Sequence, residues 1–148
     1  MFQFLDGPEL KIHKAAFLMA RLFEKDLQGA LGLSLPQFML LMTVMHKDKC
    51  SQAEIAKTRG LTEAAVSRMA DTVLEKKWMT REENPENRRE HILKLTKDGE
   101  IISQKAVEIV KANMGPVFAE LTEDERVTLD RIMDKILQSV YTKTHNYA

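Results

Sequence analysis

Residues 51–77 read SQAEIAKTRGLTEAAVSRMADTVLEKK, and this stretch predicts two short helices joined by a tight turn. Ala56 is small enough to let two helix backbones approach closely, and Gly60 can adopt the left-handed conformation that such a turn requires. Val66 is placed to face back into the angle between the helices. The spacing of these three residues predicts a helix-turn-helix, a unit whose second helix most often reads DNA.

After Lys77 the pattern of apolar residues changes from that of helices to that of strands. Residues 78–83 and 91–95 are typical of two short strands. The segment between them, residues 84–90, reads NPENRRE and begins with an Asn-Pro turn signal, so it predicts a polar hairpin tip. A helix-turn-helix followed by a β-hairpin is the winged variant of the motif.

A leading helix is predicted at the start of the chain, where apolar residues recur at helical spacing. Asp6 is a candidate cap for this helix, with Pro8 in its first turn. Gly29 and Gly32 are expected to end it.

Further helices are predicted on both sides of the hairpin. One begins near Thr96 and is expected to kink or break at residues 115–116, a Gly-Pro pair. The other helix starts are marked by capping residues: SLPQ at 34–37, SQAE at 51–54, Thr62, and TEDE at 122–125. The first and last helices carry wide apolar faces, which suggest a dimer, although one chain's own core could also cover them.

The composition favours a single domain over residues 1–148, because the chain is 44% hydrophobic and contains no linker-like or repeated segment. The 22 basic and 22 acidic residues balance, so the whole molecule exerts no strong electrostatic pull on nucleic acid. No apolar run approaches the roughly 18 residues that span a membrane, and the N-terminus lacks the features of a secretory signal. A cytoplasmic protein without a membrane segment is therefore expected.

Chemistry-bearing residues are sparse. Cys50 is the one cysteine, cannot form an internal disulfide and is predicted to be structural rather than a redox switch. No nucleophile–base pair or phosphate-binding loop is evident, so no enzyme and no cofactor are predicted. The histidines lack metal-ligand spacing, so no metal site is predicted either: His13, His46, His91 and His145.

Five short segments together resemble the MarR family of bacterial and archaeal transcriptional regulators: LPQF at 35–38, SQAEIA at 51–56, LEKK at 74–77, NPENRR at 84–89 and LTKDG at 95–99. The resemblance covers nearly the whole chain. It implies a mainly α fold with a small β-hairpin wing. It also implies a homodimer whose N- and C-terminal helices intertwine and whose two winged lobes meet a palindromic operator in double-stranded DNA.

On this reading residues 35–99 form the DNA-binding lobe, and residues 6–31 and 100–143 form the dimerisation region. Two departures from the family pattern stand out. Asn87 replaces the usual aspartate ahead of the wing arginine, which predicts a looser wing tip, and Trp78 opens a Trp-Met pair where the family has Gly-Leu.

An ideal helix from Thr62 to residue 77 places one small polar face outward, and the N-terminal residues of such a helix reach base edges in the major groove. Arg68 is the best candidate for a bidentate contact to guanine or for a phosphate contact, whereas Glu63 either accepts from a cytosine amino group or only favours the helix dipole. The resemblance sends Arg89 toward the minor groove. The predicted DNA-contacting residues are Thr62, Glu63, Ala64, Ala65, Ser67, Arg68, Thr72, Arg88 and Arg89.

The resemblance also implies a small aromatic or anionic effector, of unknown identity, that releases the regulator from DNA. Candidate lining residues are His13, Phe17, Met42 and Met45, for which ordinary core packing is the alternative. The leading functional hypothesis is a dimeric, sequence-specific repressor. The alternative is a winged-helix module used only for protein contacts, because the lobe is nearly neutral.

Overall fold

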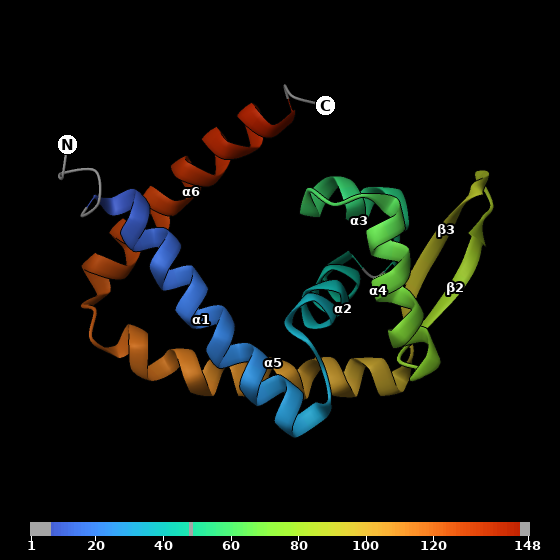
Figure 1. Ribbon diagram of the computed structural model, residues 1–148, viewed down its shortest axis with the longest axis horizontal. Coiled ribbons are helices and arrows are strands. Elements are labelled where there is room, and N and C mark those ends of the chain that lie inside the picture. Colours follow the sequence, from blue (N-terminus) through green and yellow to red (C-terminus); the bar gives the residue numbers. More distant parts are fainter. Residues whose placement is uncertain (1–6, 48, 146–148) are drawn as a thin grey trace. The chain divides into compact units, whose positions relative to one another are not determined.

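The structure is a computed structural model and describes residues 7–47 and 49–145. It confirms the mainly helical class with a small hairpin wing (Figure 1). The chain divides into two compact units after Val110, within a helix, and each unit is described by itself. The elements in chain order are α1 (Pro8–Leu31), α2 (Leu35–Lys47), β1 (Lys49–Ser51), α3 (Gln52–Arg59), α4 (Glu63–Glu75), β2 (Met79–Asn84), β3 (Asn87–Leu95), α5 (Lys97–Ala119) and α6 (Glu123–His145).

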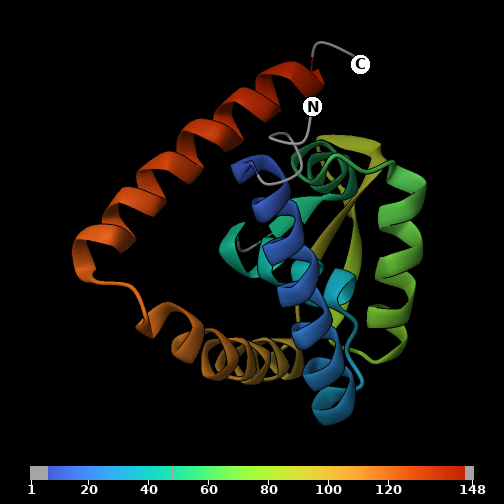
Figure 2. The same cartoon turned by 60° about the vertical axis from the view of Figure 1, so that its left-hand side comes forward.

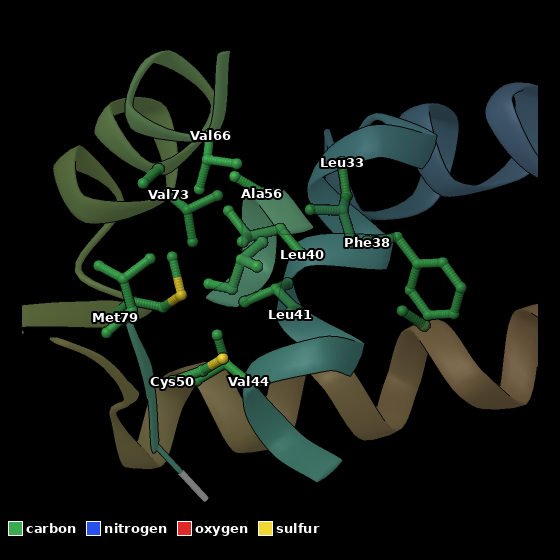
Figure 3. Close-up of a cluster of buried hydrophobic side chains, with 14 of the residues drawn as sticks. Leu33, Phe38, Leu40, Leu41, Val44, Cys50, Ala56, Val66, Val73 and Met79 are labelled. Carbon is green, nitrogen blue, oxygen red and sulfur yellow. The ribbon is translucent and has the colours of Figure 1, made fainter. Parts of the chain in front are cut away.

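The core of the first unit is built around α2. This helix is apolar on most sides, so it can be covered only from several directions at once. In Figure 3 its side chains Leu40 and Leu41 point toward Val66 and Val73 of α4 and toward Met79 of β2. The core side chains are Leu27, Leu33, Phe38, Leu40, Leu41, Val44, Cys50, Ile55, Ala56, Val66, Ala70, Val73, Met79, Leu93 and Ala106.

The helix-turn-helix forms as the sequence predicts, from α3 and α4, whose axes cross at a steep angle (Figures 1 and 2). Gly60 caps α3 in the left-handed region, with φ 63° and ψ 34°. Ala56 and Val66 are both buried, at 5% and 0% exposure. The small contact residue, the turn residue and the buried β-branched residue therefore take the roles that their spacing indicated.

The predicted capping boxes are also present. At the start of α3 the Ser51 Oγ accepts from the Glu54 N–H at 3.1 Å, and the Glu54 carboxylate accepts from the Ser51 N–H at 2.9 Å. The same reciprocal pattern joins Ser34 to Gln37 before α2, and residue 122 to residue 125 before α6. These short-range bonds satisfy N–H groups that a helix start leaves without partners.

The sheet has three strands in the order β1-β3-β2, all antiparallel. The two hairpin strands were expected from the sequence, and β3 begins earlier than predicted, at Asn87 rather than residue 91. β1 was not expected. It is only three residues long, between two helices, and it exists because Lys49 and Ser51 pair with Lys94 and Ile92 of β3.

The predicted helix ends hold in part: α1 ends at Gly32 as expected but does not end at Gly29, and α5 is not broken at residues 115–116. Gly29 lies inside α1, and Gly32 alone caps this helix, with φ 60° and its N–H bonded to carbonyls of the last turn. Pro116 lies inside α5, which continues to Ala119, because one missing N–H donor in a helix leaves the bonds of the neighbouring turns in place. Asp6 lies outside the described residues, and the N-cap position of α1 is Gly7, without a side-chain cap.

The turn after α4 forms without glycine. Lys77 takes up the left-handed conformation, with φ 58°. Among residues 7–47 and 49–145 it is the one non-glycine residue that has a positive φ. The Lys77 and Trp78 N–H groups then donate to carbonyls of Leu74 and Val73, at 2.8 and 3.1 Å. Trp78 is half-buried and packs against the core.

The start of α5 packs on this same turn. Thr96 donates from its hydroxyl to the Lys77 carbonyl at 2.8 Å and from its N–H to the Trp78 carbonyl at 3.0 Å. A Cβ at Gly99 would lie 1.8 Å from the Trp78 oxygen. The segment from residue 95 to 99 is therefore a close backbone contact between α5 and the base of the wing, and only glycine fits at its end.

Candidate nucleic-acid interface

The outer face of α4 carries the residues predicted to meet DNA. Its inner face is anchored by Val66, Ala70 and Val73, which are fully buried. The outer residues occupy the rest of the helix: Thr62, Glu63, Ala64 and Arg68 are exposed, whereas Ala65, Ser67 and Thr72 are half-buried. The structure thus brings seven of the nine predicted residues onto one exposed helix surface.

The N-terminal end of α4 is ordered by its cap. The Thr62 Oγ1 accepts from the Ala65 N–H at 3.2 Å, so this hydroxyl satisfies one of the free donors of the first turn. Glu63 lies in that first turn, where a carboxylate is favoured by the helix dipole. Both roles considered for Glu63 remain compatible with its position.

The wing carries the other two predicted residues. Arg88 and Arg89 both lie in β3 just after the hairpin tip, and Arg88 is exposed. The wing hairpin extends beside α4 in Figure 1. The described interface therefore consists of a helix that fits a major groove and a flanking hairpin that carries two consecutive arginines just after its tip.

The wing tip is cross-linked by one carboxylate. The Glu90 side chain accepts from the amide groups of Asn84 and Asn87, at 3.3 and 3.0 Å. The Asn84 side chain also accepts from the Glu86 N–H at 3.1 Å, an Asx-type turn. Asn87, expected to loosen the tip, instead donates to Glu90 and helps to hold it.

One contact at this surface was missed by sequence reasoning. Arg81 of β2 reaches across to α4, where its Nη2 lies 2.8 Å from the Asp71 Oδ1 and 3.5 Å from the Ser67 Oγ. The i,i+4 spacing of Ser67 and Asp71 was visible as one outward row of the helix. The partner from the wing was not, because the sequence does not say which strand residue faces that row.

An apolar cavity of about 800 Å³ opens beside α4, between α1, α2, α3 and α4. Thirteen of its lining residues are apolar, and the two charged ones are both arginines. Arg68 is one of these, so the residue best placed to read DNA also lines the cavity. The lining comprises Ala16, Met19, Ala20, Phe23, Leu35, Pro36, Phe38, Met39, Leu40, Ile55, Arg59, Leu61, Ala65, Arg68 and Met69.

The four effector residues considered from sequence do not line this cavity. His13 and Phe17 lie on the exposed side of α1, where Phe17 is 56% exposed. Met42 packs against the core, and Met45 lines a separate pocket of about 210 Å³ with Lys94 and Leu95 among other residues. The structure therefore does not bring them together around one space.

Cys50 is buried in the core, at 2% exposure. Burial, reinforced by the negative charge of Glu54 nearby, raises the pKa of the Cys50 thiol to about 11. A thiol with such a pKa stays protonated at neutral pH and is a poor nucleophile. This environment suits the structural role expected for Cys50.

Within residues 7–47 and 49–145, no group of three or more His, Cys, Asp or Glu side chains is arranged to hold a metal ion. In the same part of the chain no single helix is long and apolar enough to cross a membrane. The α1 and α2 pair passes that test only when taken together, and the two helices are bent by 83° at their junction.

The crossed pair of α3 and α4, the exposed outer face of α4 and the adjoining β2–β3 hairpin define a winged helix-turn-helix protein of the DNA-binding class. A family model described as "MarR family" matches residues 33–91. The multiple antibiotic resistance protein MarR of Salmonella typhimurium is 30% identical over 108 residues, which are 72% of this chain and 75% of the relative. The chain belongs to the MarR family and is a DNA-binding transcriptional regulator.

Two further comparisons agree. The HTH-type transcriptional repressor MdtR of Bacillus subtilis is 29% identical over 111 residues, 75% of this chain and 72% of that protein. A mutant of MarR from E. coli, solved in complex with operator DNA, superimposes with a TM-score of 0.80 at 26% identity, covering 93% of this chain and 98% of the other. These relatives favour DNA binding over the alternative of a module used only for protein contacts.

Proposed function

We propose that the chain is a homodimeric repressor in the cytoplasm that binds a palindromic operator. A small anionic molecule with an apolar body releases it from the operator. The observation that carries this proposal is the exposed outer face of α4 with Arg68 at its centre, beside a cavity that Arg68 also lines. The MdtR and MarR relatives, named as a repressor and as an operator-bound protein, support the repressor role.

Exposed apolar side chains support the homodimer. In α1, Phe17, Leu18 and Leu22 are 56%, 48% and 45% exposed. In α6, large apolar side chains are exposed along the length of the helix: Val127, Leu129, Ile132, Leu137, Val140 and Tyr141. Apolar surface of this extent in a single chain is typical of an interface, and a second copy would cover it.

The DNA contacts are divided between helix and wing. Arg68 is proposed to read a base or hold a phosphate in the major groove, and Ala64 and Ala65 to meet thymine methyl groups. Arg88 and Arg89 supply the positive charge that the outer face of α4 lacks. The lobe is close to neutral overall, so a large part of the affinity is assigned to these wing residues.

The operator is tested by selecting genomic fragments bound by the purified protein, followed by fluorescence titration at several salt concentrations. Specific binding should weaken steeply as salt rises, because phosphate contacts release counterions. Arg68→Ala should cost about 1–3 kcal/mol and relax sequence preference, whereas Arg88→Ala or Arg89→Ala should flatten the salt slope by about one unit. The proposed function would be overturned if the selection enriched no genomic fragment over random DNA.

The effector is placed in the cavity beside α4. Its apolar walls suit an aromatic body, and Arg59 and Arg68 suit an attached carboxylate. A ligand held by Arg68 would withdraw this side chain from DNA, so binding of ligand and operator would compete. The alternative location for the effector is the site predicted from the sequence, around Phe17 and Met45.

This placement is tested with 1-naphthoate and its neutral counterpart 1-naphthamide. The carboxylate should raise the melting temperature and release the operator, and the amide should do neither. Met39→Trp, which fills the cavity, should abolish release, whereas the matched variant Met45→Trp should leave it unchanged. Release that is lost with Met45→Trp and kept with Met39→Trp would move the effector to the alternative location.

A further inference from the structure

Arg81 links the wing to α4 through side-chain hydrogen bonds and an ion pair. It lies in β2, and its guanidinium reaches α4 at two points one helical turn apart, Ser67 and Asp71. Both of these residues belong to the outer row of α4 that also contains Arg68 and Ala64. The link therefore fixes the DNA-facing side of the helix rather than its buried side.

The burial and the contacts of Arg81 indicate that its side chain is fixed in one position against α4. Its side chain is 27% exposed, against 52% for Asp71. The Nε is buried and has no hydrogen-bond partner among the described residues. An unsatisfied buried donor is a cost to the folded state, and the contact with Asp71 offsets it by holding the guanidinium at the helix.

We propose that Arg81 is a positioning residue for operator recognition, which acts on DNA through Asp71 and Ser67 by holding α4 at a fixed angle to the wing. The proposal rests on the proposed DNA contacts of α4 and the wing. A helix in the major groove and a hairpin beside it must meet the same duplex at once. An error in the angle between them would weaken binding to the operator more than binding to random DNA, which needs only phosphate contacts.

The chain offers a matched control pair. Lys94 of β3 lies 2.8 Å from Glu82 of β2, the same distance as in the Arg81–Asp71 pair; the two carboxylates are about equally exposed, at 53% and 52%, and Lys94 is more exposed than Arg81, at 42% against 27%. Glu82 follows Arg81 directly, so its side chain points to the opposite face of the strand. The control pair thus joins strand to strand, on the face of β2 opposite to that of Arg81.

The test measures the affinity of the full-length protein for its selected operator and for a scrambled duplex. Arg81→Gln and Asp71→Asn should each lower the ratio of the two affinities by about three- to tenfold, and the double variant should lower it no further, because the two residues act as one unit. Arg81→Lys should restore part of the ratio. Glu82→Gln and Lys94→Gln should leave it unchanged.

Three results would overturn the proposal. The ratio could remain at the wild-type value in Arg81→Gln. Affinity could fall equally for both duplexes with a salt slope flatter by about one unit, which would make Arg81 a direct phosphate contact. The losses of Arg81→Gln and Asp71→Asn could add, which would separate the two residues. Failure of the wild-type protein to prefer any duplex would instead overturn the proposed function, so the two failures are distinguishable.

Discussion

The two ends of α4 are held in different ways. At the N-terminal end the contacts are local: Gly60 turns the chain in the left-handed region, and the Thr62 hydroxyl accepts from the Ala65 N–H three residues later. At the C-terminal end the contacts come from distant parts of the chain. The Lys76 amine donates to the Gly32 carbonyl at the end of α1, 44 residues away, and Gly99 of α5 packs on the Trp78 backbone.

This difference predicts two kinds of response to substitution. A methyl group added at Gly60, at the N-terminal end, would meet nothing within 4 Å and would alter only the local backbone preference. A change at the C-terminal end must move one element against another, because the atoms there are already in contact. The C-terminal end should therefore be the more sensitive of the two to a single added methyl group.

Gly99→Ala is expected to have the largest effect. Its Cβ would lie 1.8 Å from the Trp78 oxygen and 2.8 Å from the Trp78 carbonyl carbon, and both atoms are backbone. We expect a loss of about 3 kcal/mol or more in the free energy of unfolding, measured by chemical denaturation. Gly29→Ala is the matched control. It lies within α1 with nothing within 4 Å of its Cβ, so it should stabilise the fold by about 0.5–1 kcal/mol. Equal stability of the two variants would contradict the close contact.

The same difference explains what the sequence could predict. The capping boxes, the Gly60 turn and the Thr62 cap each lie within three or four residues, so their geometry is carried by the local pattern. β1 was missed because a strand of three residues exists only through its pairing with β3. A kink or a break was expected at residues 115–116, and no break forms there, because a local helix-breaking signal does not decide whether the flanking turns remain bonded.

In the candidate site, too, the local features were predictable and the contacts between distant elements were not. The outward row of α4 was predictable from helical period and from the buried Val66 and Val73 opposite it. The Arg81 contact and the cavity beside Arg68 were not, because both need the relative placement of elements far apart in sequence. Phe17 and Met45 were chosen by helical spacing, which does not report which face of α1 or α2 borders a cavity.

Gly60→Ala tests the N-terminal end of α4 in the same way. A Cβ at this position meets nothing within 4 Å, so the cost comes only from holding a non-glycine residue at φ +63°. We expect a loss of about 1–2 kcal/mol, smaller than that of Gly99→Ala. Gly60→Asn should recover part of the loss, because asparagine tolerates the left-handed region. A loss as large as that of Gly99→Ala would show that the turn, too, is sterically tight.

Lys77→Gly should act in the opposite direction. Lys77 holds φ 58° after α4, a position that favours glycine. Glycine would relieve the strain of the left-handed conformation but lose more freedom on folding, so we expect a net gain of up to about 1 kcal/mol. A higher melting temperature with unchanged operator affinity is the expected measurement. A lower melting temperature would mean that the Lys77 side chain contributes more than its backbone costs.

The smallest expected effect concerns the capping box that begins α3. The Ser51 N–H bonds to the Glu54 carboxylate and lowers the pKa of that carboxyl below its ordinary value. A carboxyl whose pKa is lowered by folding stabilises the fold above its unfolded pKa of about 4.3, and this contribution disappears as the pH falls through the lower folded value. Glu54→Gln keeps an acceptor for the Ser51 N–H but carries no charge. The variant should therefore be slightly less stable than wild type at about pH 6, and the difference should shrink as the pH falls below the unfolded pKa and through the lower folded value. A difference that stays constant over this acidic range would assign the effect to hydrogen-bond geometry rather than to charge.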